Sequence, residues 1–80
     1  MAIREIPLCI ADVGHSYVVT RMFCGRGLMQ RLISLGITPG VEVEVINKSP
    51  LGGRMVLRVG NSRIALSRGV SSKIFVVPKS

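Results

Sequence analysis

Two kinds of hydrophobic spacing divide the middle of the chain. Between residues 28 and 35 apolar side chains recur every three or four positions with polar ones between them, a pattern typical of one face of a helix. Between residues 41 and 45 valines alternate with glutamates, which predicts a strand with one buried and one solvated face. The hydrophobic period therefore changes from helical to extended across Pro39-Gly40.

Glycine and proline set the limits of the expected helix. Gly36 follows the last residue of the apolar stripe, a position where many helices end in the left-handed conformation. Pro39 then prevents the helix from resuming. We expect a helix over Gly27–Leu35, packed across one opening of a sheet, and we assign Leu32, Pro39 and Gly40 to the scaffold.

Other segments are rich in β-branched and apolar residues, which is typical of strands. These segments are Tyr17 to Phe23, Arg54 to Val59, Ser62 to Leu66 and Lys73 to Val77. In the first, we expect the face formed by Val18, Thr20 and Met22 to point inward, because side chains alternate between the two faces of a strand. Residues 67–72 are expected to form a turn or a single helical turn.

A tight hairpin is expected between the second and third of these strands. Gly60 stands at the first position of a two-residue turn, as a type II′ turn requires. Counting outward from this turn places Leu57 opposite Ile64 on an apolar face, and Arg58 opposite Arg63 on the other. Like charges in direct opposition are mildly destabilising, so these arginines are candidates for contact with an anionic partner.

Five short strands and one helix in 80 residues predict a mainly β fold. We expect a single domain over residues 1–80, built as a strongly bent antiparallel barrel of about five strands with one short α-helix, because an open sheet would leave apolar surface bare. The longest apolar run, from Ile6 to Ala11, is far shorter than the roughly 20 residues of a membrane-spanning helix. With no export signal and only two cysteines, the chain is expected in the cytoplasm, without a transmembrane segment.

The charge balance narrows the classes of partner. Lys and Arg number 11 against 4 Asp and Glu, giving a net charge of +7. Such a charge attracts nucleic acid, anionic lipid or an acidic protein surface. One short helix and no zinc-finger spacing argue against DNA, whereas a small barrel that binds RNA remains an alternative.

Candidate chemical groups are sparse. The carboxylates show no pairing suited to acid–base catalysis, and His15 stands alone in an expected turn, so no catalytic residue and no enzyme activity are expected. Cys9, His15 and Cys24 are the only soft metal ligands and lack zinc-site spacing, so neither a metal nor another cofactor is expected. Cys9 is expected to be a small buried hydrophobe.

An ordered set of dipeptides from Gly27 to Val45 closely resembles the signature of the ferrous-iron transport protein A (FeoA) family. The matching dipeptides are Arg31-Leu32, Leu35-Gly36 and Pro39-Gly40, and Ser49-Pro50-Leu51-Gly52 resembles a loop of the same family. Pro50 and Gly52 are thus further expected scaffold positions. The resemblance runs from about Ile6 to Val77 and implies an SH3-like barrel. The chain departs from the family pattern at two places where a partner could make contact. It has Gly53-Arg54 where the family often has Asp-Pro, and Gln30-Arg31 where the family often has paired arginines.

The resemblance implies an accessory protein of ferrous-iron uptake without catalysis. Its expected partner is the cytosolic part of the large ferrous-iron permease (FeoB), which would bring it to the inner face of the membrane; self-association is left open. The residues that we expect to contact the partner are Arg31, Leu35, Gly36, Arg54, Arg58, Arg63 and Arg68.

Overall fold

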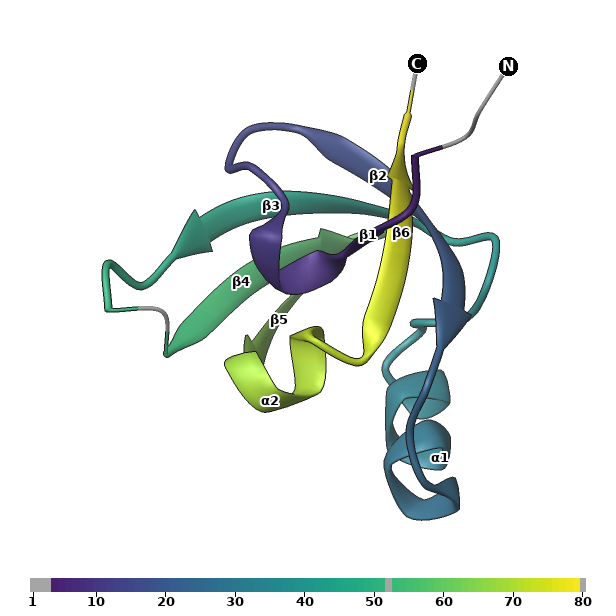
Figure 1. Ribbon diagram of the computed structural model, residues 1–80. Coiled ribbons are helices and arrows are strands. Elements are labelled where there is room, and N and C mark those ends of the chain that lie inside the picture. Colours follow the sequence, from purple (N-terminus) through teal and green to yellow (C-terminus); the bar gives the residue numbers. More distant parts are fainter. Residues whose placement is uncertain (1–3, 52, 80) are drawn as a thin grey trace.

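The computed structural model describes residues 4–51 and 53–79 and shows one antiparallel sheet accompanied by short helices (Figure 1). The sheet has the strand order β1-β6-β2-β3-β4-β5. Its strands are β1 (Ile6–Pro7), β2 (Ser16–Met22), β3 (Glu42–Lys48), β4 (Arg54–Val59), β5 (Ser62–Ser67) and β6 (Ile74–Pro78). The helices are the 3-10 helix η1 (Leu8–Ile10), α1 (Arg26–Ser34) and α2 (Arg68–Ser71).

The predicted mainly β, antiparallel architecture is confirmed, with α2 as the helical turn considered for residues 67–72 and with two differences in the sheet. The sheet has six strands instead of five, because the two-residue β1 adds to β6 through the pairs Ile6–Val76 and Pro7–Phe75. Within the described residues β1 and β5 are the edges of the sheet and are not paired with each other, so the expected closure into a barrel is not found.

The hairpin of β4 and β5 has the predicted register. Leu57 pairs with Ile64 and Arg58 pairs with Arg63. Gly60 has a φ of 60°, and no non-glycine residue of the described chain has a positive φ. Positive φ at the first turn position alone is the requirement of a type II′ turn.

The core is formed mainly by aliphatic side chains, and every strand except the short β1 contributes to it. The fully or nearly fully buried hydrophobic residues of the strands are Tyr17, Val19, Val43, Val45, Met55, Leu57, Val59, Ile64, Leu66, Ile74 and Val76. The prediction for β2 was wrong: Tyr17 and Val19 point inward, whereas Val18, Thr20 and Met22 are only partly buried. In this phase the Tyr17 hydroxyl accepts a hydrogen bond from the Asp12 amide (2.9 Å), so the ring is buried with its polar atom satisfied.

Helix α1 is attached to the core near its C-terminal end and projects away from the sheet (Figure 1). Leu32 is its one fully buried residue, while Ile33 and Leu35 are 49% and 38% exposed. The predicted helix is thus present, but only part of its apolar stripe packs against the core, through Leu32 and the partly buried Leu28. The stripe is wider than the contact with the sheet, and part of it remains at the surface.

The segment after α1 turns back sharply to β2 and β3. Gly40 has a φ of 94°, and the Val41 amide donates to the Thr38 carbonyl at 3.1 Å, closing a turn with Pro39 at its second position. The Gly40 amide donates to the carbonyl of Val19 at 2.7 Å, which ties the turn to β2. Among the helices in the described residues, none has the length and apolar character needed to cross a membrane.

Candidate docking groove

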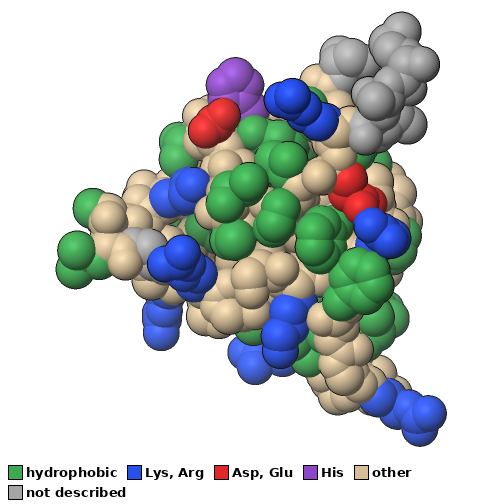
Figure 2. Space-filling model, in the orientation of Figure 1, with side chains coloured by type: hydrophobic (Ala, Val, Ile, Leu, Met, Phe, Trp, Pro, Cys, Tyr) green, Lys and Arg blue, Asp and Glu red, His purple; other side chains and the backbone are tan. Residues whose placement is uncertain are grey.

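All acidic side chains lie in the first 44 residues of the chain. The four acidic residues are Glu5, Asp12, Glu42 and Glu44, so no acidic side chain follows β3. Three of them form salt bridges in the described structure, namely Glu5 with Arg21, Glu42 with Lys79 and Glu44 with Arg58. On the face drawn in Figure 2, the end that carries α1 and α2 shows Lys and Arg without Asp or Glu.

A groove of about 370 Å³ opens between α1 on one side and β5 with α2 on the other. Its lining comprises Leu28, Arg31, Leu32, Leu35, Arg54, Ala65, Leu66, Ser67 and Val70. The lining is aliphatic except for one serine and two arginines, and it includes no carboxylate. A hollow lined by aliphatic side chains and two cationic ones suits a segment that offers aliphatic and acidic side chains together.

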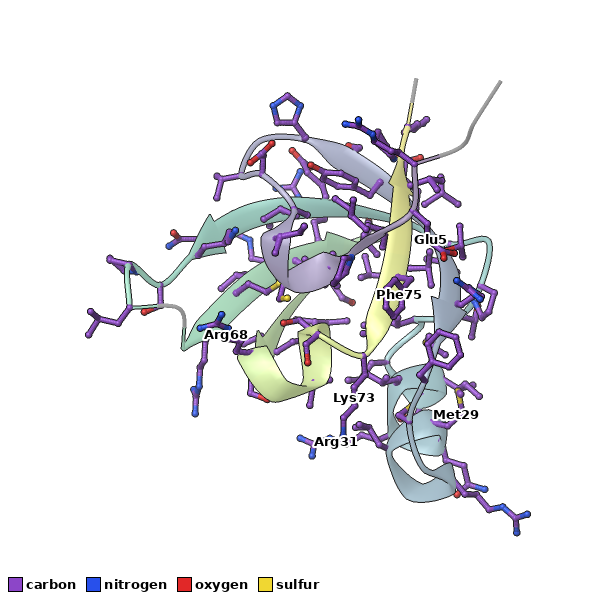
Figure 3. All side chains as sticks on the ribbon, in the orientation of Figure 1. Glu5, Met29, Arg31, Arg68, Lys73 and Phe75 are labelled. Atoms are coloured by element: carbon purple, nitrogen blue, oxygen red, sulfur yellow. The ribbon has the colours of Figure 1, made fainter. Side chains whose placement is uncertain are left out.

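Local backbone structure positions both arginines. Arg54 begins β4 and pairs with Ser67, the last residue of β5. The Ser67 hydroxyl also accepts a hydrogen bond from the Val70 amide (3.3 Å) and so caps α2. Arg31 lies in the last turn of α1, and Figure 3 shows its side chain in the region between α1 and α2.

The structure separates the seven residues proposed from the sequence into three places. Arg31, Leu35 and Arg54 line the groove. Gly36 directly follows Leu35, just beyond the end of α1. Arg68 instead lines a neighbouring hollow beside Arg54. Arg58 and Arg63 lie nearer the hairpin turn, on the outward side of β4 and β5.

One of the two opposed arginines of the hairpin has an acidic neighbour that its position in the sequence did not indicate. Glu44 pairs with Arg58 across β3 and β4, and its Oε1 lies 3.7 Å from Nη1 of Arg58. Arg58 therefore has a cation on one side and a carboxylate on the other, which offsets the repulsion from Arg63. This compensation weakens the argument for an anion site at the hairpin.

The remaining candidate groups do not assemble into a chemical site. His15 is exposed, and the described part of the chain contains no group of three or more His, Cys, Asp or Glu that could hold a metal ion. Cys9 is partly exposed, so its expected full burial was wrong. The tight turn of η1 directs Leu8 inward and leaves Cys9 and Ile10 nearer the surface. Pro50 is exposed, and Gly52 lies outside the described residues.

A polar cluster that the sequence analysis missed links the N-terminal segment to β2. Glu5 accepts hydrogen bonds from the Arg21 guanidinium and from the Thr20 hydroxyl, and both bonds lower the pKa of Glu5. The bond to Glu5 in turn raises the pKa of Arg21. The Arg21 guanidinium also lies 5.1 Å from the ring centre of Phe23, which meets Phe75 edge to face at 5.5 Å. Figure 3 shows Glu5 and Phe75 on this side of the sheet. We assign this cluster a structural role, because the carboxylate of Glu5 and the guanidinium of Arg21 are paired with each other.

Comparison with known proteins identifies the family. Residues 6–78 match the FeoA domain. The chain belongs to the FeoA family. It is 37% identical over 70 residues to an Fe(2+) transport protein A of Methanocaldococcus jannaschii, covering 88% of this chain and 83% of that protein.

Solved structures agree with this assignment. A crystal structure of an iron uptake regulatory protein, FeoA, superposes with a TM-score of 0.87 at 28% identity, covering 95% of this chain and all of that one. A manganese-dependent transcriptional repressor matches with a TM-score of 0.88, but at 16% identity over 44% of its chain it shows only the shared fold. The predicted family is confirmed, and the protein is a non-enzymatic member of a ferrous-iron transport family.

Proposed function

We propose that this FeoA-family protein docks on the cytosolic part of the ferrous-iron permease FeoB, and that the groove between α1 and α2 is its docking surface. One observation carries the proposal: Arg31 and Arg54 line a hollow together with aliphatic side chains, and this lining has no carboxylate. The occupant is an acidic segment of the permease with aliphatic side chains. Docking there would hold the protein at the cytoplasmic face of the membrane.

The groove combines the two properties that give protein interfaces their specificity. Leu28, Leu35 and Val70 offer apolar surface that is not fully buried, and its removal from water favours binding. Arg31 and Arg54 form no salt bridge within the described residues, so binding would not have to break an existing ion pair. Guanidinium groups bind carboxylates through paired hydrogen bonds, which fixes the orientation of a partner.

RNA binding, the alternative from charge alone, has weaker support in the structure. Single-stranded RNA is usually held by bases stacked on exposed aromatic rings. Of the three aromatic residues, Tyr17 is buried and Phe75 is partly buried, which leaves Phe23 as the single largely exposed ring (54%), and its neighbour Phe75 meets it edge to face. The same basic surface therefore fits an acidic protein better than a nucleic acid.

Calorimetric titration with the purified cytosolic domain of the permease tests the proposal. Arg31→Glu combined with Arg54→Glu is expected to weaken binding by about a hundredfold, since two charged contacts become repulsive. The matched control is Arg26→Glu with Arg63→Glu, which has the same change in net charge outside the groove lining. The control is expected to bind within about threefold of the parent protein. Equal losses in both variants, or a loss in the control alone, would contradict docking in the groove.

A further inference from the structure

A second hollow, of about 270 Å³, lies beside the docking groove and gathers positive charge from three separate elements. Lys48 comes from the end of β3, Arg54 from the start of β4 and Arg68 from the start of α2. Ser49 and Ser71 add hydroxyl groups, and the rest of the lining is Cys9, Ile10, Pro50 and Met55. No acidic side chain belongs to this lining.

Backbone hydrogen bonds hold the walls of this hollow in place. The Ser49 amide donates to the Arg54 carbonyl at 2.8 Å, and the Arg68 amide donates to the Gly53 carbonyl at 2.9 Å. The Lys48 ammonium donates to the Ala11 carbonyl at 3.0 Å, which fixes it against the segment after η1. The three cationic residues thus line one hollow on a formed scaffold.

The charges of this hollow lack internal compensation. Within the described residues, the side chains of Arg54 and Arg68 form no salt bridge, and Lys48 is bound only by a neutral carbonyl. Like charges gathered in a concave surface repel one another and focus a positive potential into the space between them. This potential opposes a metal cation at the Cys9 and Met55 sulfur atoms and favours an anion.

We propose that this hollow, lined by Lys48, Arg54 and Arg68, is a binding site for the phosphate group of a small ligand. Two guanidinium forks and one ammonium match a tetrahedral oxyanion, because arginine bonds two oxygens at once and lysine adds a point charge. The volume lies below the roughly 300–1,000 Å³ typical of sites for drug-sized ligands, so the site takes one phosphate or diphosphate group. Ile10 (58% exposed) and Pro50 offer an apolar rim to the remainder of the ligand.

Sodium diphosphate is the probe, titrated into nitrogen-15-labelled protein at an ionic strength held constant with sodium chloride. We expect saturable shifts of the amide signals of Ser49, Arg68 and Ser71, with little change at Arg26. Arg68→Gln is expected to weaken binding by about tenfold or more, as loss of a charge-assisted contact does. Arg54→Gln serves as a second variant with the same expectation, and the unshifted signals of each spectrum report whether the variant folds.

Arg63→Gln is the matched control, because it removes one positive charge outside this lining. It is expected to change the diphosphate affinity by less than about twofold. Shifts that do not saturate, shifts spread over all basic residues, or equal weakening by Arg63→Gln and Arg68→Gln would show that diphosphate responds only to net charge and would overturn the proposal. The permease is absent from this experiment, so its result is independent of the docking proposal.

Discussion

The amide of Ile37 donates a hydrogen bond to the carbonyl of Leu32 at 2.9 Å, and both side chains are almost completely buried. The Gly36 amide donates to the Ile33 carbonyl at 2.9 Å, and Gly36 has a φ of 89°. These two bonds, formed at a residue with positive φ, are those of a Schellman motif, and both apolar side chains beside them belong to the core. The Leu35-Gly36 dipeptide therefore fixes the end of α1, and with it one wall of the docking groove.

Gly36→Ala is expected to lower the free energy of unfolding by about 1–2 kcal/mol, because an L-residue is strained in the left-handed conformation. The added Cβ would lie 3.6 Å from the nearest Val59 carbon, so the effect arises from the backbone and not from a clash. Gly27→Ala is the control, since nothing lies within 4 Å of its added Cβ and its φ is not positive. It is expected to be neutral or to stabilise by up to about 1 kcal/mol. Urea unfolding measures the free energy of unfolding of both variants. An equal change in the two variants would contradict the role of Gly36 in the Schellman motif.

Leu32→Ala is expected to destabilise the protein by about 2–5 kcal/mol, because Leu32 is the anchor of α1 in the core. Leu35→Ala, at a residue that is 38% exposed, should lower stability by less than about 1 kcal/mol. Thermal and urea unfolding of the two variants give the comparison. A loss below about 1 kcal/mol for Leu32→Ala would mean that α1 is not anchored through this side chain.

Glu5→Gln is expected to destabilise the protein in a pH-dependent way. Hydrogen bonds from Arg21 and Thr20 lower the pKa of Glu5 below its ordinary value of 4.5 in the folded state. The ionised carboxylate therefore stabilises the fold above that ordinary value, and this contribution is lost as the pH falls through the lowered pKa. The stability difference between parent and variant should stay constant from about pH 7 to pH 5 and shrink below about pH 4.5. A difference that is unchanged at low pH would place its origin outside this carboxylate.

Glu44→Gln is expected to expose the repulsion between Arg58 and Arg63. The loss in stability should be about 0.5 kcal/mol at low salt and should diminish as salt screens the exposed charges. Adding Arg63→Gln should restore stability, because it removes the like charge opposite Arg58. Urea unfolding at low and high salt measures this cycle, and a loss that salt does not change would rule out a charge effect.

Local features of the fold were predictable from the sequence. The pairing of β4 with β5 follows from Gly60, since a two-residue turn determines every pair that extends from it. The end of α1 follows from Gly36 in the same way. β1 was not predictable, because Ile6 pairs with Val76 at the far end of the chain and two residues carry no periodic signal.

The candidate groove was predictable only in part. Arg31, Leu35 and Arg54 were identified one by one from charge and motif. Their common position depends on the direction in which α1 leaves the sheet, which tertiary contacts determine. Ala65 and Val70 complete the lining but are ordinary residues in the sequence, so no signal marked them.

Backbone hydrogen exchange, measured by mass spectrometry with and without the cytosolic domain of FeoB, tests the docking proposal most directly. The account predicts that binding slows exchange in α1 and in the segment from Ala65 to Val70, because both form the walls of the groove. The turn at Gly60, which is outside the groove lining, should exchange at the same rate in both samples. Protection confined to the hairpin turn, with α1 unchanged, would contradict the account.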